Sequence, residues 1–390
     1  MVITAANFKV NKKFARSSYL PSIDGLRALS IILVLGQHCR STSAFPSGLD
    51  ALFGWIFDGN LGVRFFFVIS GFLITWGMIL EFDRGGTVNL GHFYVRRALR
   101  ILPVYFAFII VLLGLQLVTP FKQEVATWVG NLTFTTNFGR MDSWPSEHLW
   151  SLSVEEQFYF VWPLIFAYCV RRNDTNLIIY LSMVPVVIAP ICRALWVALS
   201  SDKHHPVFLT RYWPDISQIL KPFFPYYSFF NFWDSLAVGC ICAILFARER
   251  AVIEHFLYEK AATAAMFGLA LILLPHIMTR MSILRSCVWL VGFTIQAVGF
   301  GILLLQSVAL PDWKWYRILN WRWVRRVGVL SFSIYIWQQI FSTKPDRFGL
   351  GPVWWMSFPG WLIPVLVVGF CSYYGLERPL MKLRSRLREL

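Results

Sequence analysis

The segment 61–82 reads LGVRFFFVISGFLITWGMILEF. A helix that crosses the hydrocarbon core of a bilayer needs about 20 mostly apolar residues, and this segment meets that requirement. We predict that it spans a membrane. Its first half also carries Arg64 and Ser70. An ionisable group at bilayer depth is costly unless it is paired or solvated, so Arg64 indicates a polar interior between packed helices.

The whole chain shares this composition. Of its 390 residues, 57% are apolar or aromatic and only 15% are charged, whereas soluble proteins carry about 25% charged residues. A disordered chain and a small disulfide scaffold are excluded, and the seven cysteines show no metal-ligand spacing. We therefore predict an all-α fold, a polytopic membrane helical bundle of about 10 transmembrane helices. The other nine predicted spans are 22–40, 98–119, 150–170, 177–198, 227–247, 261–278, 288–308, 328–343 and 353–374.

The basic residues predict the orientation. Most Lys and Arg outside the spans fall on the side of the two termini, which favours both termini in the cytoplasm. The basic blocks 314–326 and 378–388 resemble interfacial helices held against anionic lipid. Membrane lipid thus explains most of the net charge of +15, and no nucleic acid partner is expected. We expect one membrane domain over 1–390, with a polar tail at 1–18 and a basic C-terminal segment at 378–390.

The first span carries an arginine and a histidine on one face. Eleven residues of helix make three full turns plus about 20°, so the side chains of Arg27 and His38 point in nearly the same direction. They lie about 16 Å apart along the helix axis. Arg27 then lies toward the cytoplasmic end and His38 toward the outer end. They could hold two ends of one long substrate. The alternative is an arginine whose side chain reaches the interface and a histidine that lies in it.

The fourth span begins with a polar face. His148, Ser151, Glu155 and Tyr159 follow a 3-4-4 spacing, so their side chains share one side of a helix. A carboxylate at Glu155 could orient the ring of His38 and make it a better base. The alternative is a polar helix start at the outer interface. The external segments 120–149 and 199–226 could cover an acceptor site.

Further charged residues lie at the inner side and within a span. Three arginines lie close together near the start of the predicted span 98–119: Arg96, Arg97 and Arg100. Guanidinium groups bind phosphate oxygens well, because their planar N–H donors match the geometry of these oxygens. The three arginines indicate a phosphorylated cytoplasmic cofactor or, alternatively, a cluster that only sets orientation. Within the span 227–247, Asp234 is a further candidate for a polar site that binds substrate.

In this order, the segments resemble the acyltransferase 3 family of bacterial integral-membrane O-acyltransferases, which modify surface polysaccharides and other exported molecules. Two weaker similarities are Leu330–Trp337 and Glu377–Pro379. The four stronger matches are Ile23–Ala28 followed by His38, Gly62–Ile74, Phe93–Pro103 and His148–Tyr159.

The resemblance implies transfer of an acyl group, most often acetyl, from cytoplasmic acyl-CoA to a hydroxyl of a carbohydrate or lipid-linked glycan at the bacterial inner membrane. His38 would act as the general base, with Glu155 orienting it. An acyl-histidine intermediate on His38 remains an alternative. Arg96, Arg97 and Arg100 would hold the CoA phosphates, with Arg27 further along the donor. Ser70, His148, Ser151 and Asp234 are the predicted substrate-binding residues, and no metal is expected.

Two positions depart from the family pattern. Many members have Asp where this chain has Arg64, and many have His where it has Gln338. A second imidazole at position 338 is therefore not essential. Some members append a soluble esterase-like extension that this sequence lacks, so we expect transfer to finish within the membrane domain. The competing function is a multi-pass transporter or flippase for an anionic solute, and succinyl or a longer acyl group is an alternative to acetyl.

Overall fold

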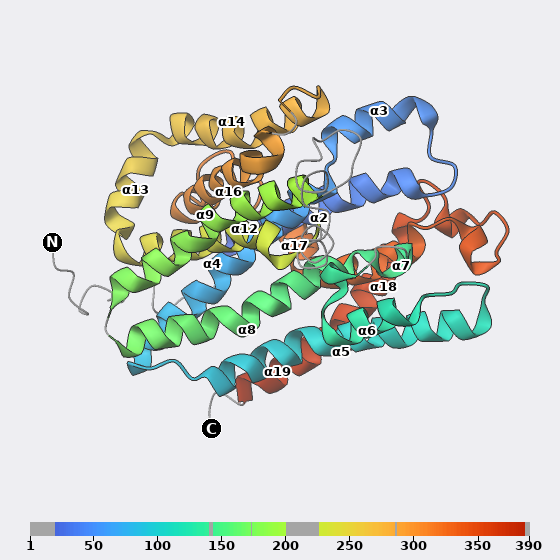
Figure 1. Cartoon of the computed structure of the whole chain (residues 1–390), viewed down its shortest axis with the longest axis horizontal. Coiled ribbons are helices and arrows are strands. Elements are labelled where there is room, and N and C mark those ends of the chain that lie inside the picture. Colours follow the sequence, from blue (N-terminus) through green and yellow to red (C-terminus); the bar gives the residue numbers. More distant parts are fainter. Residues whose placement is uncertain (1–19, 140–142, 173, 200–225, 285–286, 387–390) are drawn as a thin grey trace. The chain divides into compact units, whose positions relative to one another are not determined.

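The computed structural model describes residues 20–139, 143–172, 174–199, 226–284 and 287–386, and these residues fold into helices without a strand (Figure 1). The single β-bridge among them joins Ser43 to Ser357. The all-α fold is confirmed. The predicted tail at 1–18 and most of the segment 199–226 lie outside the described residues.

Nine of the ten predicted spans fall on helices, whereas α18 covers only the second half of the span 353–374. Ten helices correspond to the predicted spans. They are α2 (Pro21–His38), α4 (Gly59–Gly85), α5 (Leu90–Val118), α8 (Leu149–Arg171), α9 (Thr175–Leu199), α12 (Phe229–Arg248), α14 (Ala261–Arg280), α16 (Phe293–Ala309), α17 (Arg322–Phe341) and α18 (Leu362–Ser372). The π-helix η5 (Val288–Gly292) leads into α16, and a second one, η8 (Tyr373–Glu377), joins α18 to α19 (Arg378–Arg386). The shorter connecting helices are α3 (Ser47–Ile56), α6 (Val125–Thr133), α7 (Trp144–Glu147) and α13 (Arg250–Glu259).

Six helical segments of the described chain are long and apolar enough to cross a membrane. The others are more polar or shorter. For example, α8 carries Glu155 and Glu156, α17 begins with a group of arginines, and α18 is an 11-residue helix. The chain is thus a multi-pass membrane protein, whereas the count of ten spans and the side of the termini stay predictions. The six segments are Ser47–Gly85, Leu90–Val118, Asn176–Leu199, Phe229–Arg248, Ala261–Arg280 and Val288–Ala309.

The helices form two compact units, each built from separate stretches of sequence. The first unit holds 64–88 and 153–321 with the start of α2, and the second holds 27–63, 89–152 and the chain from 322 onward. Helices α2, α4 and α8 contribute to both units. The expectation of one domain over 1–390 stays a prediction.

In the first unit, α12 is the central helix. It packs against α9 and α16, and α16 packs against α14. Fifteen of the 20 residues of α12 are buried. Its Gly239 lies directly on the backbone of Val68 in α4, and Gly71 of α4 lies on the backbone of Leu236 in α12. Small residues allow such close approach of two helices in a membrane. The short helix α13 runs across the ends of α12, α14 and α16 (Figure 1).

In the second unit, α17 packs against α18 and α5, and α5 also contacts α19. The chain that leaves α2 after His38 is held to the chain that precedes α18. The backbone N–H of Phe358 donates to the carbonyl of Ser43 at 2.8 Å. The rings of Phe45, Phe53 and Phe358 pack edge to face around this bond. These contacts fix the end of α2 at which His38 lies.

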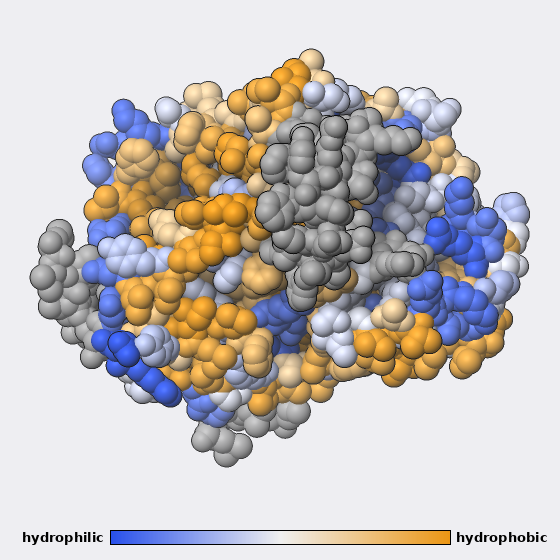
Figure 2. Space-filling model, viewed as in Figure 1, coloured by the Kyte–Doolittle hydropathy of each residue, from blue (hydrophilic) through white to orange (hydrophobic). Residues whose placement is uncertain are grey.

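The outer faces of several helices are apolar. On α9, Tyr180, Val187 and Ile191 are more than half exposed, and on α8 Phe160 is 66% exposed. Figure 2 shows hydrophobic side chains gathered over α8 and α9. A water-soluble protein rarely exposes apolar residues in such continuous patches. The exposed faces are therefore consistent with contact to lipid.

The crossing of α4 and α12 yields a stability prediction. In Gly71→Ala, the added methyl group would meet the backbone of Leu236, so we expect a loss of about 1–3 kcal/mol. In Gly77→Ala, on the same helix, the methyl group would meet nothing within 4 Å, and the better helix propensity of alanine should leave stability unchanged or raised. Thermal unfolding midpoints in detergent measure both variants. Equal midpoints would contradict the close crossing.

Candidate functional site

His38 is the last residue of α2, and its ring is held from α17. Its Nδ1 lies 2.8 Å from Oε1 of the fully buried Gln338. The hydroxyl of Ser342, one turn later, also lies within 3.5 Å of this Oε1 and donates to it. Because the amide oxygen accepts hydrogen bonds, Nδ1 of His38 carries its proton. The Nε2 atom of the neutral ring then has a free lone pair, which is the form that a general base requires.

Two further aromatic side chains, those of Trp144 and His148, lie near His38. The ring of Trp144, at the start of α7, lies 5.4 Å from the His38 ring in an edge-on arrangement. His148 is close enough to His38 for their charges to interact. The second unit thus brings together His38 and His148, two of the predicted site residues.

His148 is tightly fixed in the protein. Its Nε2 lies 3.0 Å from the carbonyl of Ile336, to which it must donate, and its backbone N–H donates to Oε1 of Gln339 at 3.0 Å. Burial, together with the nearby His38, lowers the pKa of His148 to about 3. The ring is therefore neutral, with a proton on Nε2 and a lone pair on Nδ1. Its predicted role in binding substrate stays a prediction.

The hydroxyl of Ser151 takes part in the same network. It donates to the carbonyl of His148 at 3.0 Å and lies 2.5 Å from the hydroxyl of Tyr335. The Tyr335 hydroxyl also donates to the His148 carbonyl at 3.1 Å. These bonds fix the first turn of α8 against α17. The sequence indicated Tyr335 only through the weak family similarity over Leu330–Trp337, because its partners lie more than 180 residues away.

Glu155 has a partner that the sequence did not predict. In the first unit, the hydroxyl of Ser70 on α4 donates to its Oε1 at 2.7 Å. Two turns further along, Trp162 of α8 donates to the hydroxyl of Thr75 of α4 at 2.9 Å. The two bonds show that α4 and α8 run side by side here. The structure joins two predicted site residues, Ser70 and Glu155, whereas the hydrogen bond from Glu155 to His38 stays a prediction.

The arginine cluster lies in the first turns of α5. Asn89 caps this helix, since its side-chain oxygen accepts from the N–H of His92 at 2.9 Å. Arg96, Arg97 and Arg100 are all half-buried. The guanidinium of Arg97 lies 5.9 Å from the centre of the Phe93 ring. Such partly exposed guanidinium groups on one helix can bind phosphate oxygens.

A buried carboxylate connects this cluster to Arg27. Glu377, at the end of η8, is only 2% exposed and accepts a hydrogen bond from the hydroxyl of Ser333. Burial raises the pKa of Glu377, while the Ser333 bond and the positive charges of Arg100 and Arg27 oppose this shift. Arg27 and Arg100 thus act on one carboxylate. The sequence indicated Glu377 only through a weak family similarity at the C-terminal end.

Asp234 is engaged in a buried ion pair of the first unit. Arg193 of α9 donates to its Oδ2 at 2.8 Å, and neither side chain has any exposed surface. Thr294 of α16 donates to the same oxygen at 2.5 Å and accepts from Arg193 at 2.6 Å. This three-helix network supplies a structural reason for both buried charges. A role of Asp234 in binding substrate stays a prediction.

Arg64 belongs to the same region. Its guanidinium lies 3.5 Å from the centre of the Phe293 ring and donates to Oε1 of Gln296. The guanidinium of Arg193 lies 5.4 Å from the same ring. An aromatic face attracts a cation, and more strongly when water is excluded. A cation at position 64 is thus accommodated by an aromatic ring and an amide.

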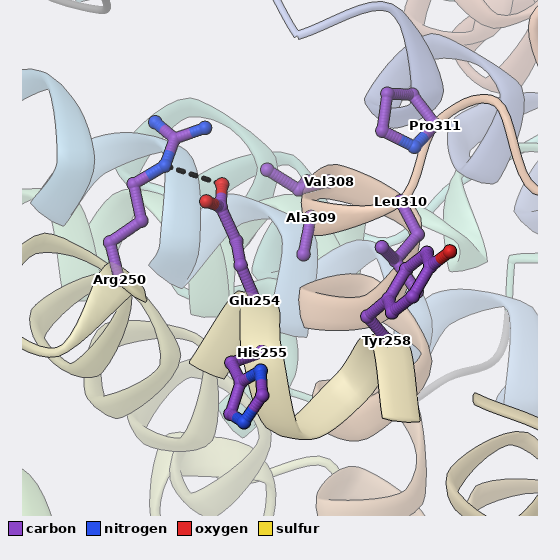
Figure 3. A pocket seen from close by; sticks show the side chains of 8 residues that line it. All are labelled: Arg250, Glu254, His255, Tyr258, Val308, Ala309, Leu310 and Pro311. Atoms are coloured by element: carbon purple, nitrogen blue, oxygen red, sulfur yellow. Dashed lines mark hydrogen bonds and ion pairs between the residues drawn. The ribbon is translucent and has the colours of Figure 1, made fainter. Parts of the chain in front are cut away.

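One open pocket of about 460 Å³ lies in the first unit, between α13 and the turn after α16. In Figure 3, Arg250 and Glu254 form an ion pair at 2.6 Å on one side, with the ring of Tyr258 on the other. Val308, Ala309, Leu310 and Pro311 supply the remaining wall together with His255. None of the predicted site residues lines this pocket.

The ion pair yields a prediction. Asp234→Leu would leave the charge of Arg193 buried without its carboxylate, which costs about 3–5 kcal/mol. The double variant Asp234→Leu with Arg193→Met removes both charges, so we expect it to recover much of that loss. Thermal unfolding in detergent, compared with the wild type, measures both. The single variant Arg193→Met completes the comparison. If the loss of stability in the double variant equals the summed losses of Asp234→Leu and Arg193→Met, the two residues are not coupled.

Known proteins similar in sequence to this chain are O-acetyltransferases. The chain is 26% identical over 351 residues to the O-acetyltransferase OatA of Staphylococcus aureus, covering 85% of this chain and 52% of that protein. It is 26% identical over 392 residues to the peptidoglycan O-acetyltransferase OatA of Listeria monocytogenes, with 93% and 56% covered. A putative peptidoglycan O-acetyltransferase of Bacillus subtilis, YrhL, is 24% identical over 390 residues, with 93% and 55% covered.

The chain therefore spans about half the length of the curated relatives it matches. No solved structure matches it. A family model described as an acyltransferase domain matches residues 20–374. This range covers most of both compact units and contains the His38 surroundings, the arginine cluster and the Ser70–Glu155 pair. On this match, the chain belongs to the acyltransferase 3 family.

Proposed function

We propose that the protein is a membrane O-acetyltransferase that moves an acetyl group from acyl-CoA, supplied on the cytoplasmic side, to a hydroxyl of a glycan. The observation that carries the proposal is the bond between His38 Nδ1 and Gln338 Oε1 at 2.8 Å. It fixes the proton on Nδ1 and leaves Nε2 as a base. Family membership supports acyl transfer, and the names of the relatives support acetyl and peptidoglycan.

The chemistry follows from this tautomer. Nε2 of His38 takes the proton of the acceptor hydroxyl as its oxygen attacks the carbonyl carbon of the thioester. A carbon–oxygen bond forms, and the carbonyl electrons move onto the carbonyl oxygen. When the intermediate collapses, the carbon–sulfur bond breaks and the imidazolium returns its proton to the departing thiolate. The products are the ester and free CoA, and the histidine regains its starting state.

The arginine cluster would hold the donor. Arg96, Arg97 and Arg100 offer guanidinium groups to the phosphates of CoA, and Arg27 lies further along the donor toward His38. Glu377 supports this arrangement, because its charge acts on both Arg27 and Arg100 and can keep their side chains oriented when no donor is bound. We place the protein in the bacterial inner membrane, where cytoplasmic acyl-CoA and an external glycan meet across one bilayer.

The first functional prediction concerns the base. His38→Ala should reduce acetyl transfer by at least about 100-fold, because a positioned general base contributes about 10²–10⁴-fold. His255→Ala, which alters a histidine exposed on α13, should keep wild-type activity. The assay follows labelled acetyl groups from acetyl-CoA to peptidoglycan fragments in proteoliposomes. Near-normal transfer by His38→Ala would refute the proposed base, and solute movement without acetyl-CoA consumption would favour a transporter.

The second functional prediction concerns the donor site. Arg97→Ala with Arg100→Ala should raise the KM for acetyl-CoA by about 10-fold or more, since a hydrogen bond to a charged group contributes about 1.5–3 kcal/mol. The KM for the glycan should change little. Arg171→Ala removes an exposed arginine at the end of α8 and serves as the matched control. An unchanged KM for acetyl-CoA would remove the two arginines from the donor site.

A further inference from the structure

Two hydrogen-bond donors beside His38 have no partner among the described residues. They are Nε2 of Gln338 and Nε1 of Trp144, and both atoms are buried. Native proteins pair about 90% or more of their buried polar groups, because an unpaired one costs about 1–3 kcal/mol. Two such donors next to a single catalytic imidazole therefore require an explanation.

Two contacts place the side chains that carry these donors against the imidazole. The oxygen of the Gln338 amide accepts from Nδ1 of His38 at 2.8 Å, so the NH₂ of the same amide lies beside the ring. The Trp144 ring packs edge-on against the His38 ring, with 5.4 Å between ring centres. The two donors come from different elements, α17 and α7, and both border the histidine.

The nearby His148 does not belong to this donor pair. Its Nε2–H is used by the carbonyl of Ile336, and its Nδ1 has no partner among the described residues. In this tautomer Nδ1 accepts a hydrogen bond and cannot donate one. The unpaired donors at the His38 ring are thus the amide of Gln338 and the indole of Trp144.

We propose that Gln338 Nε2–H and Trp144 Nε1–H form the oxyanion site of the acyl transfer and donate to the carbonyl oxygen of the thioester. This inference rests on the proposed function. Negative charge develops on that oxygen as the acceptor hydroxyl attacks and His38 takes its proton. Donors that are already in place and shielded from water stabilise this charge at no cost of reorganisation.

The arrangement gives Gln338 two roles through one side chain. Its oxygen selects the His38 tautomer that can act as a base, and its NH₂ stabilises the oxygen that becomes negative. The base and the oxyanion donor are thereby held in fixed relation by one amide. The leaving thiolate recovers the proton from His38, so neither Gln338 nor Trp144 gains or loses a proton.

The main test removes one N–H and little else. Trp144→Phe keeps an aromatic ring against His38 but lacks the indole donor. We expect kcat to fall by about 100-fold or more, while the KM values for acetyl-CoA and for the glycan stay within about twofold, because the bond to the oxyanion forms only in the transition state. Trp315→Phe, which alters a tryptophan that is 62% exposed, is the matched control and should behave as wild type.

A second pair of variants separates the two roles of Gln338. Gln338→Leu removes both, and we expect kcat to fall at least as far as in Trp144→Phe. Gln338→Glu keeps an acceptor at Nδ1 but replaces the donor with a negative oxygen. Its kcat should also fall, and the acidic limb of its kcat/KM profile should move to higher pH by about one unit or more, because a carboxylate favours the imidazolium.

A stability measurement separates catalysis from a packing defect. Gln306 is also a buried glutamine, but its NH₂ donates to the carbonyl of Ala261 and its oxygen accepts from Tyr316. Gln306→Leu should therefore lower the unfolding midpoint clearly. Gln338→Leu removes a donor that has no partner among the residues the structure describes, so its midpoint should fall less. A midpoint of Gln338→Leu far below that of Gln306→Leu would indicate a structural role and overturn the proposal.

The outcomes distinguish this inference from the proposed function. If the wild-type protein transfers no acetyl group, the proposed function fails. If the wild type is active and His38→Ala is not, but Trp144→Phe keeps its kcat, the oxyanion site is wrong while the proposed function stands. A rise in the KM for the glycan with unchanged kcat would likewise overturn the inference, because the donors would then bind the acceptor.

Discussion

A polar side chain that is buried in an apolar helix must find its partner on another helix, and this constraint organises the structure. Ser70 and Glu155 join α4 to α8, and Arg193 with Asp234 joins α9 to α12. In the second unit, His38 and Gln338 join α2 to α17. Apolar contacts alone give helices in lipid little preference for one neighbour, so such directional bonds select particular helix pairs.

The same constraint applies to buried polar groups that have no hydrogen-bond partner among the described residues. Gln306 and Gln338 are both fully buried glutamines. Both ends of the Gln306 amide are engaged within the protein, whereas the Gln338 amide is engaged at its oxygen and finds no partner for its nitrogen in the described part of the chain. The contrast between two identical side chains separates a group that holds helices together from one whose nitrogen we propose donates to the substrate.

The second unit gathers charges from distant parts of the sequence. Arg27 in α2, Arg100 in α5 and Glu377 in η8 interact electrostatically. The packing of α5 against η8 and α19 supports this arrangement. A buried carboxylate that faces two guanidinium groups lowers the cost of keeping them partly buried. The segment that follows the matched domain, which ends at residue 374, therefore contributes to the place proposed for the donor.

The sequence by itself determined the helices, because the hydropathy that drives a segment into a membrane is a local property of about 20 consecutive residues. It also identified the family and indicated His38, Glu155 and the arginines of α5, since polar residues in apolar stretches are conspicuous. Only the tertiary structure decided the partners: Gln338 lies 300 residues from His38, and Asp234 lies 41 residues from Arg193. No local pattern encodes such contacts. They depend on which helices pack together, and that choice is made by the folded chain as a whole.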